Sequence, residues 1–199
     1  MIAIVDYGAG NLTSVKKAFD RLGMESVVTS DPSCVRKAEK IVVPGVGHFD
    51  TTKKVSESGL RAVALDSISR GVPLLGICVG MQWLFDSSEE SPQTKGLGLF
   101  QGVCGRFPVE VKSPHVGWNQ LHMRGQSILM DGISRDSFVY FTHSYRAPIV
   151  PETCAATEYG GLFSSAVERG NVFGVQFHPE KSSDVGLRIL RNFCGILLC

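Results

Sequence analysis

The chain has 199 residues, of which 43% are hydrophobic, and 20 basic residues nearly balance 19 acidic ones to give a formal charge of +1. This size and composition allow one extensive core, so we expect a single domain over residues 1–199. The balanced charge and the lack of a basic tract argue against nucleic-acid binding. No apolar run approaches the roughly 18 residues of a membrane span, and no signal peptide is visible, so we expect a cytoplasmic protein.

The first half of the chain alternates short apolar runs with helical patterns. We expect buried strands at Ile2–Val5, Glu25–Thr29, Ile41–Val43 and Val72–Gly76, and helices at Leu12–Leu22 and Leu60–Arg70. Continuous apolar strands between helices are typical of a parallel sheet covered on both faces.

The second half contains mostly strand patterns separated by short turns. The expected strands are Val103–Val111, His115–His122, Phe138–Tyr145, Cys154–Tyr159, Ala166–Arg169 and Val172–Phe177. An amphipathic helix is expected over Val185–Leu198, with Leu187, Leu190, Phe193 and Leu197 on one side. The predicted fold is therefore α/β: a three-layer open mixed sheet, mostly parallel with an antiparallel extension, and helices on both faces. Pro44, Pro73 and Pro179 are expected at strand starts or in loops, where a missing N–H costs little.

Six cysteines are scattered along the chain without a C-x-x-C pair or a zinc-like spacing. They are Cys34, Cys78, Cys104, Cys154, Cys194 and Cys199. A chain of this length does not need disulfides, so we interpret them as free thiols and expect no metal site.

One of these thiols lies in a distinctive segment, in which a buried strand leads into Gly76-Ile77-Cys78-Val79-Gly80. A Gly-x-Cys-x-Gly sequence between a strand and a helix is the pattern of a nucleophile elbow with cysteine as the nucleophile. The tight turn needs small residues on both sides, and the helix dipole at such a position favours the thiolate. The N–H of Val79 is a candidate oxyanion donor. The alternative is a buried cysteine between two packing glycines.

A candidate base follows the last predicted strand, in Phe177-His178-Pro179-Glu180. If the extended conformation continues past His178, Glu180 projects to the same side as the imidazole. A carboxylate held beside an imidazole fixes its tautomer and stabilises the imidazolium. The sequence therefore offers Cys78 as nucleophile, His178 as base and Glu180 as orienter. A structural role is the alternative for a single histidine.

These two segments together resemble the class I (triad) glutamine amidotransferases. The resemblance implies hydrolysis of glutamine to glutamate and ammonia without a cofactor. It also implies a second oxyanion donor at the N–H of Val46, and glutamine contacts at Gly47, Gln82, His143, Ser144 and Tyr145. A solvent-facing Gln82 and ordinary strand pairing of residues 143–145 are the alternatives.

Further segments are similar to the branch of this family that serves histidine biosynthesis. They begin at Asp6, Pro44, Pro114, His143 and His178, and they extend from the first strand almost to the last helix. This resemblance implies a heterodimer in which ammonia passes to a separate (β/α)₈-barrel cyclase subunit. Trp118, Asn119, Tyr140 and Lys181 match positions expected at that interface. Trp118 could equally pack in the core, and Lys181 could be a plain surface charge.

Other functions remain as alternatives at this stage. The chain could be the glutaminase of another synthase, a γ-glutamyl hydrolase or cysteine peptidase with the same elbow, or a silent regulatory subunit. A dinucleotide site is rejected, because Gly8-Ala9-Gly10-Asn11 is followed by Thr13 where the third glycine of the fingerprint would stand.

Overall fold

The structure is a computed structural model that describes residues 1–197. Its strands are β1 (Ile2–Val5), β2 (Ser26–Thr29), β3 (Lys40–Gly45), β4 (Leu74–Cys78), β5 (Ser87–Ser88), β6 (Val103–Arg106), β7 (His115–Gln120), β8 (His122–Met123), β9 (Phe138–His143), β10 (Tyr145–Arg146), β11 (Thr153–Glu158), β12 (Leu162–Arg169) and β13 (Val172–Val175). Its helices are α1 (Leu12–Arg21), α2 (Pro32–Arg36), α3 (Lys53–Glu57), α4 (Leu60–Ser69), α5 (Val79–Trp83) and α6 (Ser183–Gly195), with 3₁₀ turns η1 (Phe49–Thr52) and η2 (Pro179–Lys181).

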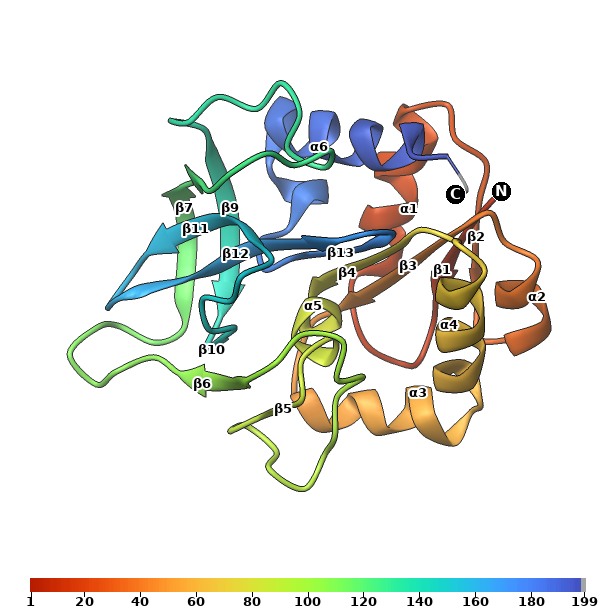
Figure 1. Ribbon diagram of the computed structural model, residues 1–199, viewed down its shortest axis with the longest axis horizontal. Helices are drawn as coiled ribbons and strands as arrows, with labels where there is room; N and C mark the ends of the chain where they lie inside the picture. The colour runs from red at the N-terminus through yellow and green to blue at the C-terminus, as the bar shows by residue number, and fades with distance from the viewer. Residues whose placement is uncertain (198–199) are drawn as a thin grey trace.

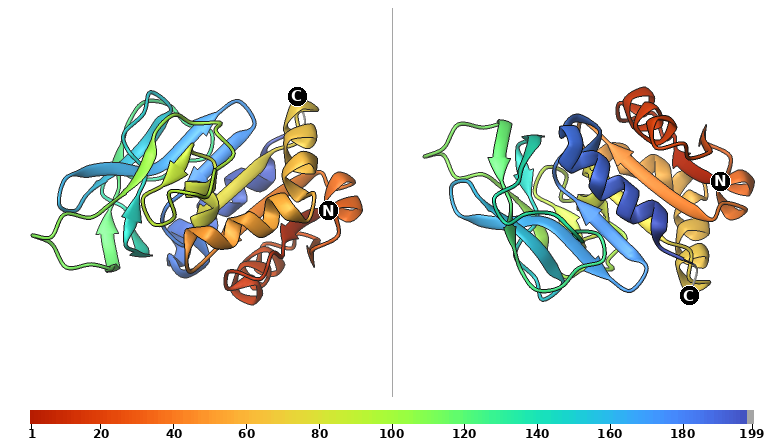
Figure 2. Two further views of the ribbon diagram at one scale, coloured as in Figure 1. Left: turned by 90° about the horizontal axis from the view of Figure 1, so that it is seen from below. Right: turned by 90° about the horizontal axis from the view of Figure 1, so that it is seen from above.

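An eight-stranded sheet runs through the molecule in the order β2-β1-β3-β4-β13-β12-β11-β8. The strands from β2 to β13 pair in parallel, and β12, β11 and β8 extend the sheet with antiparallel pairs. Helices α1 and α6 cover one face, and α3, α4 and α5 lie on the other (Figures 1 and 2). The predicted mixed, mostly parallel sheet with helices on both faces is confirmed.

The central strands follow from their sequences. Every residue of β1, β3, β4 and β13 is buried, as expected for parallel strands covered on both faces. Local caps fix where helices begin. The Asn11 side chain accepts the N–H of Ser14 at the start of α1, and Asp31 accepts the N–H of Ser33 at the start of α2. The sequence analysis missed α2, α3 and both 3₁₀ turns, which are too short to show a clear period.

The second half departs from the expected single antiparallel extension. Strands β7 and β9 form a separate two-stranded ribbon, and β5, β6 and β10 form a three-stranded sheet. The segment expected as a strand over Val103–Val111 is extended only as far as Arg106. In the β7–β9 ribbon, buried side chains such as Phe141 alternate with exposed ones such as Trp118. The β7–β9 ribbon, at the left of Figure 1, therefore has one mostly buried and one mostly exposed face.

The expected position of one proline is corrected. Pro44 lies within β3, beyond Val42, where pairing with β1 ends, so only the β4 side is still paired there, at Ile77. A proline is tolerated at such a half-paired position because one edge of the strand needs no N–H donor. Pro73 and Pro179 lie immediately before β4 and at the start of η2, as expected.

The C-terminal helix α6 ends at Gly195, earlier than predicted. Leu190 and Phe193 are buried, but Leu197 lies beyond the helix and is 79% exposed, so it does not share their packing role. The predicted last residue of this helix, Leu198, and the predicted free thiol of Cys199 lie outside the described residues. The five cysteines within residues 1–197 are free thiols. Over the same residues, no helix is both long and apolar enough to cross a membrane.

The backbones are closely packed where β4 joins α5. A Cβ placed on Gly80 would lie 1.8 Å from the carbonyl oxygen of Val43, and one on Gly76 would lie 2.5 Å from that of Gly80. Both distances are far inside van der Waals contact, and the atoms met are backbone atoms that cannot rotate away. Helix α5 is only five residues long, with Leu84 at its C-terminal cap.

The elbow glycines give a first prediction. Gly80→Ala should destabilise the fold by about 3 kcal/mol, because the new methyl group forces β3 and α5 apart. Gly195→Ala is the matched control, since among residues 1–197 no neighbouring atom lies within 4 Å of its Cβ position. Chemical denaturation of both variants measures the difference, and wild-type stability of Gly80→Ala would show that the elbow is not closely packed.

Candidate active site

Cys78 stands at the end of β4, in a conformation that side chains rarely adopt. Its φ of 54° and ψ of −110° place it in a sharp turn before α5. Such strain persists only where the surrounding structure holds it, and it concentrates at functional sites. The Cys78 side chain is 2% exposed. Its Sγ lies 3.9 Å from the carbonyl oxygen of Thr142 and 3.7 Å from Nε2 of Gln176.

His178 reaches the same region because β13 is the neighbour of β4. The two strands are parallel, with Val175 opposite Ile77, so the segments after both strands emerge at one edge of the sheet. The His178 N–H donates to the carbonyl oxygen of Tyr140 at 2.9 Å, which ties this segment to β9.

Glu180 lies beside His178, but not by the expected route. The chain turns into η2 at Pro179 instead of staying extended, and this turn brings the carboxylate back to the ring. The distance from His178 Nδ1 to Glu180 Oε1 is 2.9 Å, and both side chains are 1% exposed. An imidazole whose Nδ1–H donates to a carboxylate keeps Nε2 for the nucleophile.

The charge balance of this group favours a protonated imidazole. Burial by itself lowers the pKa of His178, but charge interaction and hydrogen bonding with Cys78, and then with Glu180, outweigh it. The net effect raises the pKa of His178 from 6.5 to about 10. A thiolate beside an imidazolium is the activated form of a cysteine nucleophile.

A pocket of about 280 Å³ opens next to Cys78. It brings together every residue that sequence analysis assigned to oxyanion stabilisation or glutamine contact. Its walls are Val46, Gly47, Cys78, Val79, Gln82, Glu90, Pro114, Thr142, His143, Ser144 and Tyr145. His178 and Glu180 do not line this pocket.

Gln82 is buried and is not the solvent-facing residue of the alternative interpretation. Its Nε2 donates to the carbonyl oxygen of Tyr145 at 2.8 Å and to Oε1 of Gln176 at 3.1 Å. Its Oε1 is buried without a hydrogen-bond partner among the described residues. A buried acceptor that lines a pocket and lacks a partner is suited to receive a donor from a bound molecule.

Two residues that the sequence analysis missed belong to this region. Gln176 donates toward Cys78 Sγ, and its signal was a lone amide in an otherwise apolar strand, two residues before His178. Glu90 lines the pocket, and its Oε2 accepts the N–H of Phe49 at 2.7 Å. Glu90 lies in an irregular loop, where no pattern in the sequence marks it.

The four candidate interface residues lie on or beside the exposed ribbon. Trp118 is 51% exposed, so it does not pack in the core, and its ring meets that of Tyr140 edge-on at 6.1 Å. Lys181 Nζ lies 5.7 Å from the centre of the Tyr140 ring. Asn119 instead turns its amide inward, toward His115 and the carbonyl oxygen of Glu158.

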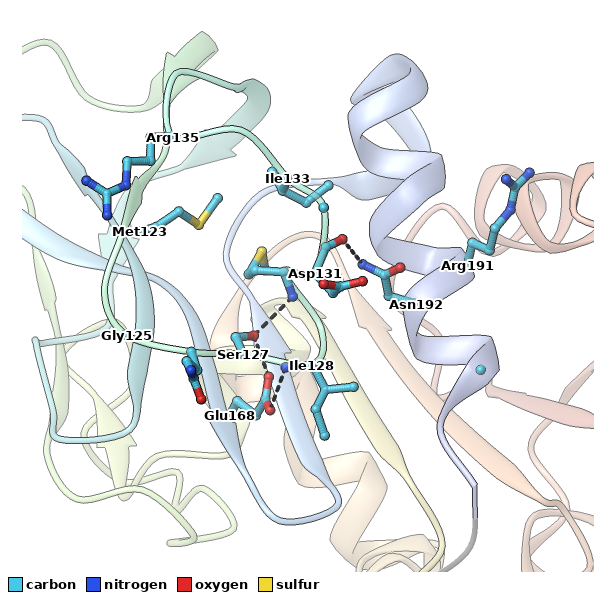
Figure 3. A pocket seen from close by; sticks show the side chains of 14 residues that line it. Met123, Gly125, Ser127, Ile128, Asp131, Ile133, Arg135, Glu168, Arg191 and Asn192 are labelled. Carbon is cyan, nitrogen blue, oxygen red and sulfur yellow. Dashed lines mark hydrogen bonds between the residues drawn. The ribbon is translucent and has the colours of Figure 1, made fainter.

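A larger cavity, of about 940 Å³, lies elsewhere, between the 123–135 segment, β12 and α6 (Figure 3). Its polar groups serve the local fold. The Glu168 carboxylate accepts from Ser127 Oγ and from the N–H groups of Ile128 and Leu129, and Asn192 donates to the carbonyl oxygens of Leu129 and Asp131. Volume alone therefore does not identify the site; the residues around Cys78 do.

Comparison with known proteins agrees with this geometry. Residues 3–196 match the family described as glutamine amidotransferase class-I. The chain belongs to the class-I glutamine amidotransferase family.

Two similar proteins are both named imidazole glycerol phosphate synthase subunit HisH. The protein from Moorella thermoacetica is 49% identical over 197 residues, covering 96% of this chain and 93% of the relative. The protein from Thermococcus kodakarensis is 49% identical over 199 residues, covering 97% of this chain and 98% of the relative.

Solved structures share the fold at low sequence identity. A crystal structure of a glutamine amidotransferase superposes with a TM-score of 0.77 at 20% identity, covering 98% of this chain and all of the other. The glutaminase domain of Trypanosoma brucei CTPS, with bound acivicin, gives a TM-score of 0.65 at 17% identity, with 100% and 96% coverage.

The contact between Glu180 and His178 leads to a second prediction. Glu180→Gln removes a charge that raises the pKa of His178, so the imidazolium form should be lost at a lower pH. We expect glutamine turnover to fall roughly 100-fold or more and the alkaline limb of its pH profile to move to lower pH. The readout is kcat/KM for glutamine against pH, and exposed Glu57→Gln is the control. A wild-type profile in Glu180→Gln would remove the carboxylate from the mechanism.

Proposed function

We propose that this chain is the glutaminase subunit of an imidazole glycerol phosphate synthase. It hydrolyses glutamine to glutamate and ammonia, and it delivers the ammonia to a (β/α)₈-barrel cyclase subunit in a heterodimer. The observation that carries the proposal is the Cys78 thiol at the wall of a small pocket, beside a buried His178–Glu180 pair. The 49% identical relatives support the choice of synthase.

The proposed chemistry is nucleophilic acyl transfer. The Cys78 thiolate attacks the side-chain amide carbon of glutamine, and the N–H groups of Val46 and Val79 stabilise the oxyanion. Protonated His178 gives its proton to the leaving nitrogen, which departs as ammonia and leaves a glutamyl thioester. His178 then takes a proton from water, which attacks the thioester and releases glutamate. Glu180 holds the ring through both steps.

The pocket also supports recognition of the amino-acid end of glutamine. Glu90 places a carboxylate in the wall, which suits the α-ammonium group. The unpartnered Oε1 of Gln82 is an acceptor for an N–H of the bound substrate. The backbone of Ser144 and Tyr145 and the nearby Gly47 complete the polar contacts in this proposal.

The exposed face of the β7–β9 ribbon is the proposed contact with the cyclase. Val116, Trp118 and Phe138 each leave at least half of their surface exposed on this face. The ribbon also contacts the proposed active site, because the Tyr140 carbonyl oxygen accepts the N–H of His178. A partner seated here would lie close to the point where ammonia is released. Exposed aromatic side chains are common anchors of such interfaces.

In this proposal the ammonia acceptor is phosphoribulosyl formimino aminoimidazole carboxamide ribonucleotide. The complex then produces imidazole glycerol phosphate, for histidine biosynthesis, and aminoimidazole carboxamide ribonucleotide (AICAR).

Glutaminase activity should be low in the isolated chain and should rise when the barrel subunit and its ligand are added. A γ-glutamyl hydrolase or cysteine peptidase would instead cleave γ-glutamyl peptides without the cyclase.

Replacement of the nucleophile tests the proposed chemistry. Cys78→Ala should abolish glutamine-dependent formation of imidazole glycerol phosphate, because the proposed glutamyl thioester forms on the Cys78 sulfur. Activity with added ammonia should persist, because the cyclase site is untouched. Cys34→Ala, a half-buried thiol in α2, is the control. Normal glutamine turnover by folded Cys78→Ala would overturn the proposal.

Replacement of the exposed tryptophan tests the proposed interface. Trp118→Ala should weaken binding of the cyclase at least about tenfold, as expected for loss of an aromatic anchor. Ile128→Ala is the control, because Ile128 is 60% exposed but lies on the segment lining the larger cavity. Titration calorimetry compares the two variants, and equal affinities would place the interface elsewhere.

A further inference from the structure

Two buried histidines that the proposed chemistry does not use face each other across the β7–β9 ribbon. His115 and His143 are opposite in the strand register, and they are 4% and 6% exposed. His115 Nδ1 lies 3.2 Å from His143 Nε2, within hydrogen-bond range. One of these two nitrogens must therefore donate and the other accept.

The other ring nitrogen of His143 decides which one donates. His143 Nδ1 lies 2.9 Å from the carbonyl oxygen of Tyr145, which can only accept. Nδ1 therefore carries the hydrogen. In a neutral ring Nε2 is then the acceptor, and it receives the Nδ1–H of His115.

The other end of this chain of hydrogen bonds, at Asn119, gives the same direction of donation. His115 Nε2, now an acceptor, lies 3.3 Å from Nδ2 of Asn119. The orientation of this amide is fixed, because Asn119 Oδ1 accepts the N–H of Gln120 at 2.8 Å and Nδ2 donates to the carbonyl oxygen of Glu158 at 3.2 Å. The donors therefore run in one direction, from Asn119 through His115 and His143 to Tyr145.

An additional proton on either histidine does not fit this chain of hydrogen bonds. A hydrogen on Nε2 of His115 would face the amide hydrogens of Asn119, and one on Nε2 of His143 would face the Nδ1–H of His115. Burial opposes charge as well, and it lowers the pKa of His115 to about 4. Burial is also the main cause that lowers the pKa of His143 to about 3; the hydrogen bond to Tyr145 acts in the opposite direction, and charge interactions with His115, His178 and Arg146 lower the pKa further. Tyr159 stacks on His115 at 4.0 Å and keeps water from that face.

The pair acts on the glutamine pocket through one carbonyl group. The carbonyl oxygen of Tyr145 accepts from both His143 Nδ1 and Gln82 Nε2. Gln82 also donates to Gln176, which donates toward Cys78 Sγ. The position of the Tyr145 carbonyl group thus fixes both the backbone conformation of this part of the pocket wall and the orientation of Gln82.

We infer that His115 and His143 are positioning residues for glutamine: a neutral pair of Nδ1–H tautomers that holds the 143–145 segment, and with it Gln82, in the geometry that binds the substrate. This inference rests on the proposed glutaminase function. It assigns neither histidine to the bond-making steps, and it makes the pair act on the affinity for glutamine.

The tautomers can be observed directly and without any assay of activity. In ¹⁵N-histidine-labelled protein, two rings should show a protonated Nδ1 and an unprotonated Nε2 at pH 6, where ordinary histidines titrate. Single replacement of His115 or His143 assigns the signals. An Nε2–H tautomer or a positively charged ring at either position would overturn the inference.

Two substitutions separate hydrogen bonding from packing. His115→Phe keeps an aromatic ring against Tyr159 and Phe141 but removes both nitrogens. His115→Asn loses the ring but places an amide N–H about where Nδ1 lay. In complex with the cyclase, we expect KM for glutamine to rise about tenfold in His115→Phe with little change in kcat, and to recover largely in His115→Asn.

The outcomes of this comparison are distinct. A wild-type KM in His115→Phe, or an equal loss in both variants, would contradict the positioning role. If His115→Phe does not fold, the tautomers of the wild-type protein still decide. Absence of glutaminase activity in the wild-type complex would count against the proposed function but would leave the tautomer result intact, so the two failures are distinguishable.

Discussion

The candidate active site depends on a close approach of backbones at the end of β4. With no side chains at Gly76 and Gly80, α5 can start against β3, and a Cβ at Gly80 would meet the Val43 carbonyl oxygen at 1.8 Å. This packing holds Cys78 at a positive φ, from which the chain turns sharply into α5. Fully buried strands on both sides make the turn rigid, so the strain is supported by the sheet.

The remaining groups are placed by the sheet order. Because β13 pairs directly with β4, residues far apart in the chain emerge at one edge, and His178 and Gln176 approach Cys78 from the same segment. The β9 strand closes the third side, where Tyr140 receives the His178 N–H and Thr142 lies over the thiol. The same ribbon carries the exposed face proposed for the cyclase. The candidate catalytic geometry and the proposed partner contact thus share one two-stranded element.

Much of the fold could be predicted from the sequence, because central parallel strands are apolar throughout and their connecting helices are periodic. The nucleophile elbow could also be predicted, because Gly76, Cys78 and Gly80 together form a recognisable pattern that none of these residues shows alone. The separation of β7 and β9 from the main sheet could not be predicted, because a strand with alternating buried and exposed residues has the same sequence pattern whichever sheet it joins. The C-terminal helix was predicted to continue to Leu198 for a similar reason: an apolar side chain such as Leu197 fits the helical period even where it is largely exposed.

The candidate site was predictable where residues adjoin a motif and not where tertiary contacts place them. His178 and Glu180 were found together, although a 3₁₀ turn and not an extended chain joins them. Glu90 reaches the pocket from an irregular loop, and only the fold could place it there. The roles of His115 and Asn119 depend on hydrogen-bond direction, which requires coordinates for both ends of the chain of donors.

The proposed mechanism requires that Cys78 is the thiol presented to glutamine. Its most direct test is labelling with an electrophile that mimics glutamine, followed by peptide mapping of all six cysteines. We expect one modification, at Cys78, which excess glutamine prevents and which slows when Glu180 is replaced by glutamine. Labelling spread over the other cysteines, or insensitive to glutamine, would contradict it.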